Sequence, residues 1–181
     1  SRALRPLRNN IIHTNKMPGT DAQKVAAIAT VVLYGKYWLT TILQGTKKKP
    51  AGLGATEDGG NSFSSVAVAT SAVATSAGAP ADNKAMETAL RWQRIVANDV
   101  ENIPIALVVM WACANTVTVD ETVPFIIYCC LYVVARIAHT ICYANGINKL
   151  GGAFPLRTVC FAIGFLMVHI MAITTVVVMF K

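Results

Sequence analysis

The sequence predicts an all-α integral membrane protein built as a four-helix bundle. Of its 181 residues, 54% are hydrophobic and only 14% are charged, against roughly 25% charged residues in an average soluble domain. So few charges could not cover the surface of a soluble globule. The mean hydropathy is +0.49, and four apolar segments each reach the length of about 20 residues that a bilayer-spanning helix needs. Because a backbone inside lipid must satisfy its own hydrogen bonds, each segment is expected to be a helix.

The four expected helices are bounded by polar or turn-forming residues. They cover residues 22–44, 92–119, 124–145 and 155–180. A lysine run follows the first helix, Asp120 and Glu121 follow the second, and a glycine-containing stretch follows the third. We therefore expect one domain over residues 21–181, with both chain ends on the same side of the membrane because the number of spans is even.

The stretch 50–89 is expected to be a low-complexity loop, because Ala, Ser, Thr and Gly dominate it. A fifth membrane span is the alternative. It is disfavoured, since the apolar run is short, is rich in Ser and Thr, and is interrupted by Gly78 and Pro80.

Basic residues gather at the ends of the apolar segments. Sixteen Lys and Arg stand against nine Asp and Glu, which gives a formal net charge of +7. This arrangement suits anionic membrane lipids, and no nucleic-acid partner is expected because no basic stretch carries interleaved aromatic residues. The loop side has more positive charges close to the helices, so we place it on the cytosol-like side. Its cations include Lys47, Lys48, Lys49, Lys84, Arg91 and Lys149.

Residues 1–20 form a basic tail without an acidic residue. Its cations are Arg2, Arg5, Arg8 and Lys16. Two interpretations fit such a tail, the remainder of an organellar presequence and an ordinary basic segment next to a membrane helix. The composition is compatible with both.

The five cysteines all lie inside apolar stretches. None has the Cys/Cys or Cys/His spacing that is typical of a metal site. We therefore expect them to be small, buried hydrophobic residues, and we expect neither disulfides nor a bound metal ion.

Two stripes of polar side chains interrupt the apolar helices, each at helical spacing. They are Arg91, Arg94, Asn98 and Glu101 in the second expected helix, and Arg136, His139 and Tyr143 in the third. A charged residue at the centre of a bilayer costs about 2.5–3.5 kcal/mol. The stripes are therefore expected to face each other and to form a polar pocket near the loop side. Asp99 points off the first stripe and is expected to serve helix packing or a capping contact.

This pocket has two interpretations. In the first, Glu101 and Arg136 form an intramembrane ion pair that only locks the bundle. In the second, the set binds a small zwitterion or polyanion, since Asn98 and Glu101 suit an ammonium group while Arg94 suits a carboxylate. The sequence holds no motif for a nucleophile, a catalytic metal or a phosphate loop. Any reactive group is therefore expected to arrive with the ligand.

Three blocks of the sequence resemble the MAPEG family, the membrane-associated proteins in eicosanoid and glutathione metabolism. The blocks are RWQRIVANDVENIP, VARIAHTICY and FPLRTVCF, which are similar to the family's motifs in its second, third and fourth helices. The resemblance implies a homotrimer of four-helix subunits. It also implies glutathione as a co-substrate, bound between neighbouring subunits near the cytosolic face.

The resemblance assigns roles to individual residues. The expected glutathione-binding set, which includes Arg136 through its place in the polar stripe, is Lys48, Arg94, Asn98, Glu101, Arg136, His139 and Tyr143. Arg157 matches the arginine that is proposed to stabilise the glutathione thiolate, and Thr158 matches a nearby hydroxyl residue. A guanidinium at the start of a helix, aided by the helix dipole, is suited to that role.

Several residues depart from the family pattern. Ala97 stands where some members have a further arginine, Phe161 replaces a tyrosine, and Pro104 comes one position earlier. We therefore weigh two functions. The first is a glutathione-dependent transferase or peroxidase of lipid metabolism that acts on a lipophilic substrate. The alternative is a non-catalytic structural or accessory subunit of a larger, mitochondrial membrane complex. The expected location is the endoplasmic reticulum or a mitochondrial membrane.

Overall fold

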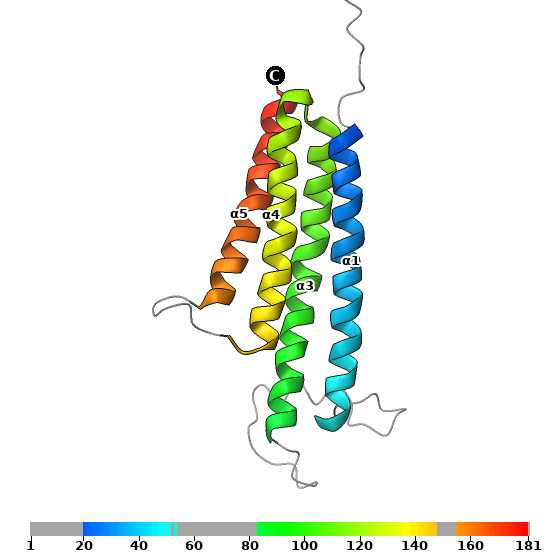
Figure 1. Ribbon diagram of the computed structural model, residues 1–181, viewed down its shortest axis with the longest axis vertical. Helices are drawn as coiled ribbons and strands as arrows, with labels where there is room; N and C mark the ends of the chain where they lie inside the picture. Colours follow the sequence, from blue (N-terminus) through cyan, green and yellow to red (C-terminus); the bar gives the residue numbers. More distant parts are fainter. Residues whose placement is uncertain (1–19, 52, 54–82, 148–154, 181) are drawn as a thin grey trace, which may run out of the picture.

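The computed structural model is a bundle of four long helices (Figure 1). It describes residues 20–51, 53, 83–147 and 155–180. The helices are α1 (Thr20–Lys48), α3 (Asn83–Thr116), α4 (Val119–Ala144) and α5 (Leu156–Met179), and a short 3-10 helix, η1 (Lys49–Ala51), follows α1. These residues contain no strand. The predicted tail 1–20 lies outside the described residues except for its last position, and so does most of the predicted loop 50–89.

The helices run up and down, so their connections alternate between the two ends of the bundle. The start of α1, the α3–α4 turn and the end of α5 lie at one end, as Figure 1 shows. The end of α1, the start of α3 and the α4–α5 connection lie at the other, which we call the loop-bearing end. The most extensive packing joins α4 to α5 and α1 to α3. Each of the four helices is long and apolar enough to cross a membrane, which confirms the predicted four-helix membrane bundle.

Helix α3 is longer than predicted at its N-terminal end. It begins at Asn83 instead of residue 92, so residues 83–89 of the expected loop are helical. This segment is too polar to be recognised by hydropathy, but it contains strong helix formers. Its Glu87 also pairs with Arg91 one turn later, with Oε1 and Nη2 2.9 Å apart. At a rise of about 1.5 Å per residue α3 is about 51 Å long, so it exceeds the hydrocarbon layer of about 30 Å.

The turn between α3 and α4 is shorter than predicted. Asp120 and Glu121, which were expected in the connection, form the first turn of α4. The Glu121 carboxylate accepts a hydrogen bond from the backbone N–H of Thr118 at 3.1 Å. This contact satisfies one free donor at the helix start, and acidic residues there complement the helix dipole.

Pro104 lies inside α3, which continues past it to Thr116.

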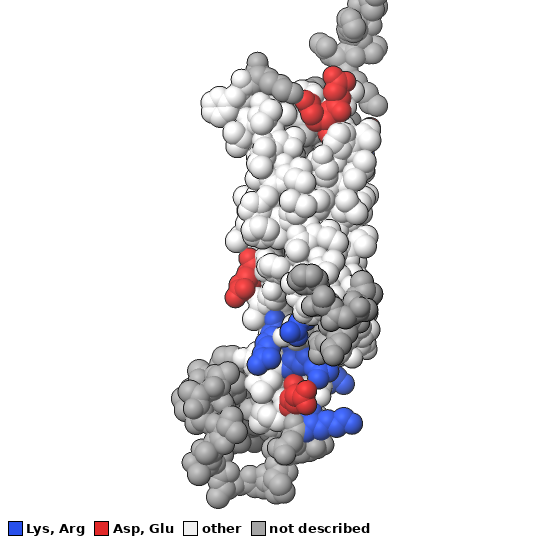
Figure 2. Space-filling view, turned by 90° about the vertical axis from the view of Figure 1, so that its left-hand side faces the viewer, with Lys and Arg blue, Asp and Glu red and all other residues white. Residues whose placement is uncertain are grey.

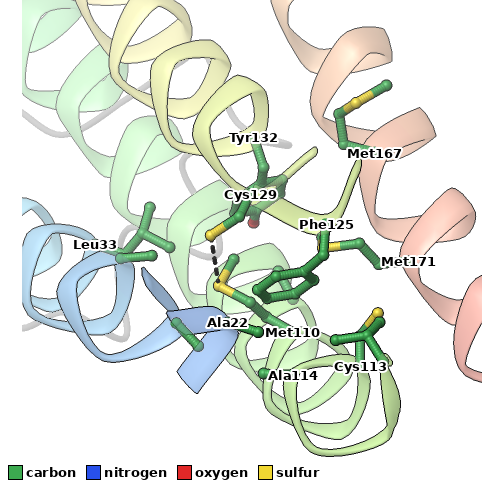
Figure 3. Packing of buried hydrophobic residues seen from close by; sticks show 14 of the residues in the cluster. Ala22, Leu33, Met110, Cys113, Ala114, Phe125, Cys129, Tyr132, Met167 and Met171 are labelled. Carbon is green, nitrogen blue, oxygen red and sulfur yellow. Dashed lines mark hydrogen bonds between the residues drawn. The ribbon is translucent and has the colours of Figure 1, made fainter. Parts of the chain in front are cut away.

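The apolar core lies where all four helices meet (Figure 3). Ala26 and Ala29 are buried on α1, and such small residues let neighbouring helices approach closely. The sulfur of Cys129 lies 3.3 Å from the sulfur of Met110, beside the buried ring of Phe125. The core therefore depends on close packing of small and flexible side chains, which is the main source of helix association inside lipid.

The cysteines are all free thiols, as expected from their apolar surroundings. Four of them are buried, and these are Cys113, Cys129, Cys142 and Cys160. The prediction of burial is wrong for Cys130, which lies on the outer surface of α4. Its neighbour Leu131 is also exposed, so Cys130 belongs to the apolar outer surface of the bundle.

The outer surface carries a broad apolar band. Large hydrophobic residues such as Val31, Val108 and Ile173 are more than half exposed. Figure 2 shows this band in white, with acidic side chains at its upper end and at its lower edge, and with Lys and Arg gathered towards the loop-bearing end. Such a surface is covered by lipid in a membrane protein. The cytosol-like orientation of this end stays a prediction, because the cations expected at the opposite end lie outside the described residues.

We predict that Ala26→Leu will destabilise the bundle, because Ala26 is fully buried and an enlarged side chain would separate α1 from its neighbours. Overpacking of this kind costs about 1–3 kcal/mol. Thermal unfolding of the purified protein in detergent measures the effect. Ile28→Leu is the control, since Ile28 is 64% exposed; equal melting temperatures for the two variants would contradict the packing described here.

Candidate functional site

A carboxylate at the centre of the bundle holds three helices together. The side chain of Asp99 on α3 is 1% exposed, and each of its oxygens receives a charged donor. Lys36 on α1 donates from Nζ to Oδ2 at 2.6 Å, and Arg136 on α4 donates from Nη2 to Oδ1 at 3.0 Å. The hydroxyl of Thr40 donates to Oδ2 at 3.3 Å. We call these four residues the charge cluster.

The charge cluster is extended by amide groups on α3. Nη2 of Arg136 also donates to Oδ1 of Asn98 at 2.8 Å and to the Asn98 carbonyl at 3.2 Å. The Asn102 amide donates to the same carbonyl at 2.8 Å, and the Tyr132 hydroxyl donates to the carbonyl of Asn102 at 3.3 Å. These bonds compensate buried polar groups that water cannot reach inside a membrane bundle.

The prediction that Glu101 faces Arg136 is wrong within a single chain. Glu101 lies on the exposed face of α3, whereas Asp99 is buried and pairs with Arg136. Helix geometry gives the reason, because residues two positions apart are separated by about 200° around the axis. Only one of the two acids can therefore point inward. Of the two interpretations, the locking ion pair does exist, but Asp99 forms it.

The sequence places an isoleucine four residues before and four residues after Asp99, which is the spacing of one helix face. The structure shows that both, Ile95 and Ile103, are buried. The interior stripe of α3 thus runs through position 99, and Glu101 is outside it. Lys36 was not predicted from the sequence as part of this buried site. The signal that could have identified it is a single lysine in the middle of an apolar helix, because such a residue needs a buried partner of opposite charge.

A second polar site lies at the loop-bearing end, and we call it the arginine cleft. Its volume is about 210 Å³, and its lining residues are Glu87, Leu90, Arg91 and Arg94 of α3, Tyr143 and Gly146 at the end of α4, and Arg157 of α5. The Arg157 guanidinium stands over the Tyr143 ring at 5.3 Å from the centroid, a favourable cation–π contact. Three guanidinium groups around one cleft favour an anionic ligand.

Gly146 keeps one wall of the arginine cleft open. Its φ is +66°, which favours glycine, and a Cβ there would come within 3.3 Å of Nη1 of Arg91. Arg91 is held by Glu87 through a bond of 2.9 Å. The turn after α4 and the first turns of α3 are thereby positioned against each other around the cleft.

Aromatic side chains extend inward from the arginine cleft along α4 and α5. The centroid of the buried His139 ring lies 5.8 Å from Tyr143 and 6.4 Å from Phe161. Phe161 stacks on Phe165 at 6.3 Å, and Phe165 contacts His169 at 4.0 Å. We call this series the aromatic row. It brings His139 between the two polar sites, with the charge cluster on one side and the cleft on the other.

The structure therefore divides the predicted site residues into three groups. Arg94, Tyr143 and Arg157 line the arginine cleft, and Asn98 and Arg136 belong to the buried network with His139 nearby. Glu101, Lys48 and Thr158 join neither group. Thr158 is exposed on the first turn of α5, where its N–H bonds to the carbonyl of Pro155 at 2.8 Å. Lys48 is half-buried at the end of α1.

The described ranges contain no group of three His, Cys, Asp or Glu side chains that could hold a metal ion.

A sequence model of the MAPEG family matches residues 25–177, nearly the whole chain. The chain belongs to the MAPEG family. MAPEG proteins include glutathione-dependent transferases and peroxidases as well as non-catalytic members, and the family as a whole generally uses glutathione. No protein of curated function matches the chain.

We predict that Asp99→Asn will destabilise this MAPEG bundle far more than Glu101→Gln. Removal of the Asp99 charge leaves two buried cations without their carboxylate, and breaking a buried pair in this way costs about 3–5 kcal/mol. The exposed Glu101 makes no ion pair with any of the residues that the structure describes, so its amide variant should stay within about 0.5 kcal/mol. Thermal unfolding in detergent separates the two. A larger loss for Glu101→Gln would show that the inward acid has been misidentified.

Proposed function

We propose that the protein binds glutathione in the arginine cleft and uses it in a transferase or peroxidase reaction on a lipophilic substrate. The observation that supports this proposal is the grouping of three arginines and one glutamate around the cleft. Their net formal charge is +2, and glutathione with its thiol ionised carries two carboxylates, one ammonium and one thiolate. The charges of ligand and cleft are therefore complementary, and guanidinium groups bind carboxylates in a bidentate manner.

Arg157 is the residue that we propose to stabilise the glutathione thiolate. It lies in the first turn of α5, where the helix dipole also favours negative charge. An ordinary thiol has a pKa of about 8.5, and lowering it to about 6.5 takes about 2.7 kcal/mol of preferential stabilisation of the thiolate. One partly desolvated guanidinium together with the dipole can provide that amount. Thr158 is a weaker candidate, because it is exposed beside Arg157 and does not line the cleft.

The chemistry follows from the bound thiolate. In a transferase reaction its sulfur attacks an electrophilic carbon of the substrate, a C–S bond forms, and the leaving oxygen or halide departs with the electron pair. In a peroxidase reaction two glutathione molecules are oxidised to the disulfide while a hydroperoxide is reduced to an alcohol and water. Both reactions need a lipophilic substrate close to the thiolate, and the apolar surface of α5 beside Arg157 gives access from the bilayer.

We further propose a homotrimer, in which neighbouring copies complete the site. Glu101 is exposed on α3 beside exposed apolar residues such as Val100 and Ile105. Lipid does not solvate a carboxylate, so a second copy of the chain is the partner that best explains an exposed Glu101. The half-buried Lys48 does not line the cleft of its own chain. Its expected contact with glutathione would then be made in a neighbouring copy.

A specific observation favours the alternative function, a non-catalytic subunit of a larger membrane complex. The amide oxygen of Asn98 already accepts a bond from Arg136 at 2.8 Å, so this side chain serves the bundle instead of a ligand. Phe161 adds no hydroxyl to the site. In this alternative the arginine cleft binds a partner protein or an anionic lipid, and the expected location is a mitochondrial membrane instead of the endoplasmic reticulum.

We predict that Arg157→Gln will lower the rate of glutathione conjugation by about 10²–10³-fold. Loss of one hydrogen-bond donor to the negative charge of a reacting group has effects of this size. Glutathione binding should persist through the other arginines. Turnover of a lipophilic electrophile in proteoliposomes and calorimetric binding measure the two quantities. Lys24→Gln, at the opposite end of the bundle, is the control. Full activity in Arg157→Gln would rule out the assigned role.

We also predict that glutathione binding will depend on Arg94. A charged hydrogen bond contributes about 1.5–3 kcal/mol, so Arg94→Gln should weaken binding by at least about tenfold. The exposed Lys49→Gln, on η1, is the matched control. Absence of binding in the unmodified protein, combined with its purification as part of a larger assembly, would instead support the non-catalytic function.

A further inference from the structure

Two buried cysteines are in contact where α4 ends and α5 begins. Cys142 lies in the last turn of α4, and Cys160 lies in the second turn of α5. Both are free thiols, with relative exposures of 6% and 8%, and a hydrogen bond joins the two side chains. We call them the thiol pair. It connects the two helices at the loop-bearing end of the bundle (Figure 1).

The antiparallel packing of α4 and α5 holds the thiol pair in register. Contacts between these helices follow one another from the bundle centre towards the loop-bearing end. In this order they are Gly164 with Arg136, Phe161 with His139, Cys160 with Cys142 and Arg157 with Tyr143. The thiol pair is thus one step of a continuous interface. Because the thiols already touch, side-chain rotation with little helix movement would bring the sulfurs to bonding distance.

The other buried cysteines have different partners. The sulfur of Cys129 lies 3.3 Å from the thioether sulfur of Met110, and the thiol of Cys113 bonds to Thr175. Neither a thioether nor a hydroxyl can form a disulfide with a thiol. These contacts lie in the apolar core, whereas the thiol pair lies near the end of the bundle.

The thiol pair adjoins the arginine cleft. Cys142 directly precedes Tyr143, and Cys160 lies one turn after Arg157. Tyr143 and Arg157 both line the cleft, and so does Gly146 at the end of α4. A water-soluble anion that the cleft attracts would therefore arrive beside the two thiols. Glutathione disulfide is such an anion, because its four carboxylates and two ammonium groups give a net charge of about −2 at neutral pH.

We propose that the thiol pair is a redox-active dithiol, which glutathione disulfide oxidises to a Cys142–Cys160 disulfide. One cysteine loses its proton and its thiolate attacks a sulfur of glutathione disulfide. The S–S bond of that molecule breaks, a mixed disulfide forms, and the first glutathione leaves as a thiolate and takes up a proton. The second cysteine, as a thiolate, then attacks the protein sulfur of the mixed disulfide and releases the second glutathione. Two cysteine thiols are oxidised, and one glutathione disulfide is reduced to two glutathione molecules.

The contact between the thiols favours the second step, because the attacking sulfur is already beside the mixed disulfide. The new bond would join the last turn of α4 to α5 next to the cleft and would close residues 142–160 into a covalent loop. Such a loop restricts the unfolded chain, so the oxidised protein should be more stable. The inference goes beyond the proposed function, since it needs neither a conjugation reaction nor a thiolate held by Arg157.

The experiment treats the purified full-length protein in detergent with excess glutathione disulfide, blocks free thiols and digests the protein with trypsin. Trypsin separates the two cysteines, because Lys149 and Arg157 lie between them. We expect peptide 137–149 to be linked to peptide 158–181 by a disulfide that dithiothreitol removes. The oxidised protein should also melt at a higher temperature than the reduced protein. Cys142→Ser and Cys160→Ser should abolish both effects, and one of these variants should retain glutathione as a mixed disulfide.

Cys113→Ser is the matched control, because it removes a buried cysteine outside the thiol pair, and it should still form the link. The proposal is overturned if Cys142 and Cys160 of the unmodified protein are recovered as free thiols, or if Cys113 and Cys129 become linked as readily. A lower melting temperature after oxidation would equally contradict it. Arg157→Gln should form the link while conjugation falls. A protein that forms the link but never conjugates glutathione would contradict the proposed function alone.

Discussion

The ion pairs of Asp99 are the constraint on which the rest of this bundle depends. A lysine and an arginine point into a helical interior that lies within the membrane, where an unpaired cation is strongly unfavourable. Among the described residues, one carboxylate serves both cations, and it does so from a third helix. Each of α1, α3 and α4 therefore has a fixed rotation about its axis and a fixed height relative to the other two. Apolar packing alone would let these helices slide along one another, because their apolar surfaces are similar.

The fixed rotation of α3 determines what the molecule presents to its surroundings. With position 99 inward, Arg94 and Glu101 must lie on the outer side of the helix. At the loop-bearing end α3 extends beyond the hydrocarbon layer, so Arg91 and Arg94 meet Arg157 where water is available. Helix α3 thus supplies the counter-charge of the interior, two of the three arginines of the cleft and an exposed acid on the apolar surface. The same ion pairs support the architecture and place the cleft.

The sequence predicts the four helices well because hydropathy over about 20 residues is a strong signal. It fails at the start of α3, where polar but strongly helix-forming residues continue the helix outside the membrane. Helical spacing places Arg91, Arg94, Asn98 and Glu101 in one stripe, but the expectation that Glu101 faces inward is wrong, because Glu101 is exposed and Asp99 is buried. Only the positions of buried neighbours such as Ile95 and Ile103 decide between Asp99 and Glu101. For the same reason Arg157 lines the cleft while Thr158, about 100° further round α5, does not.

The polar and apolar sites follow one another along the bundle. The arginine cleft lies at the loop-bearing end, and the aromatic row continues from Tyr143 through His139 to Phe161. Phe161 and Phe165 line an apolar groove of about 250 Å³ between α3, α4 and α5. Under the proposed function, a water-soluble thiol would enter from solution and a lipophilic compound from the bilayer. The two would meet where the arginine cleft adjoins this apolar groove. Phe161 lies at that boundary, between His139 and the lining of the groove, so its phenyl ring makes the boundary apolar.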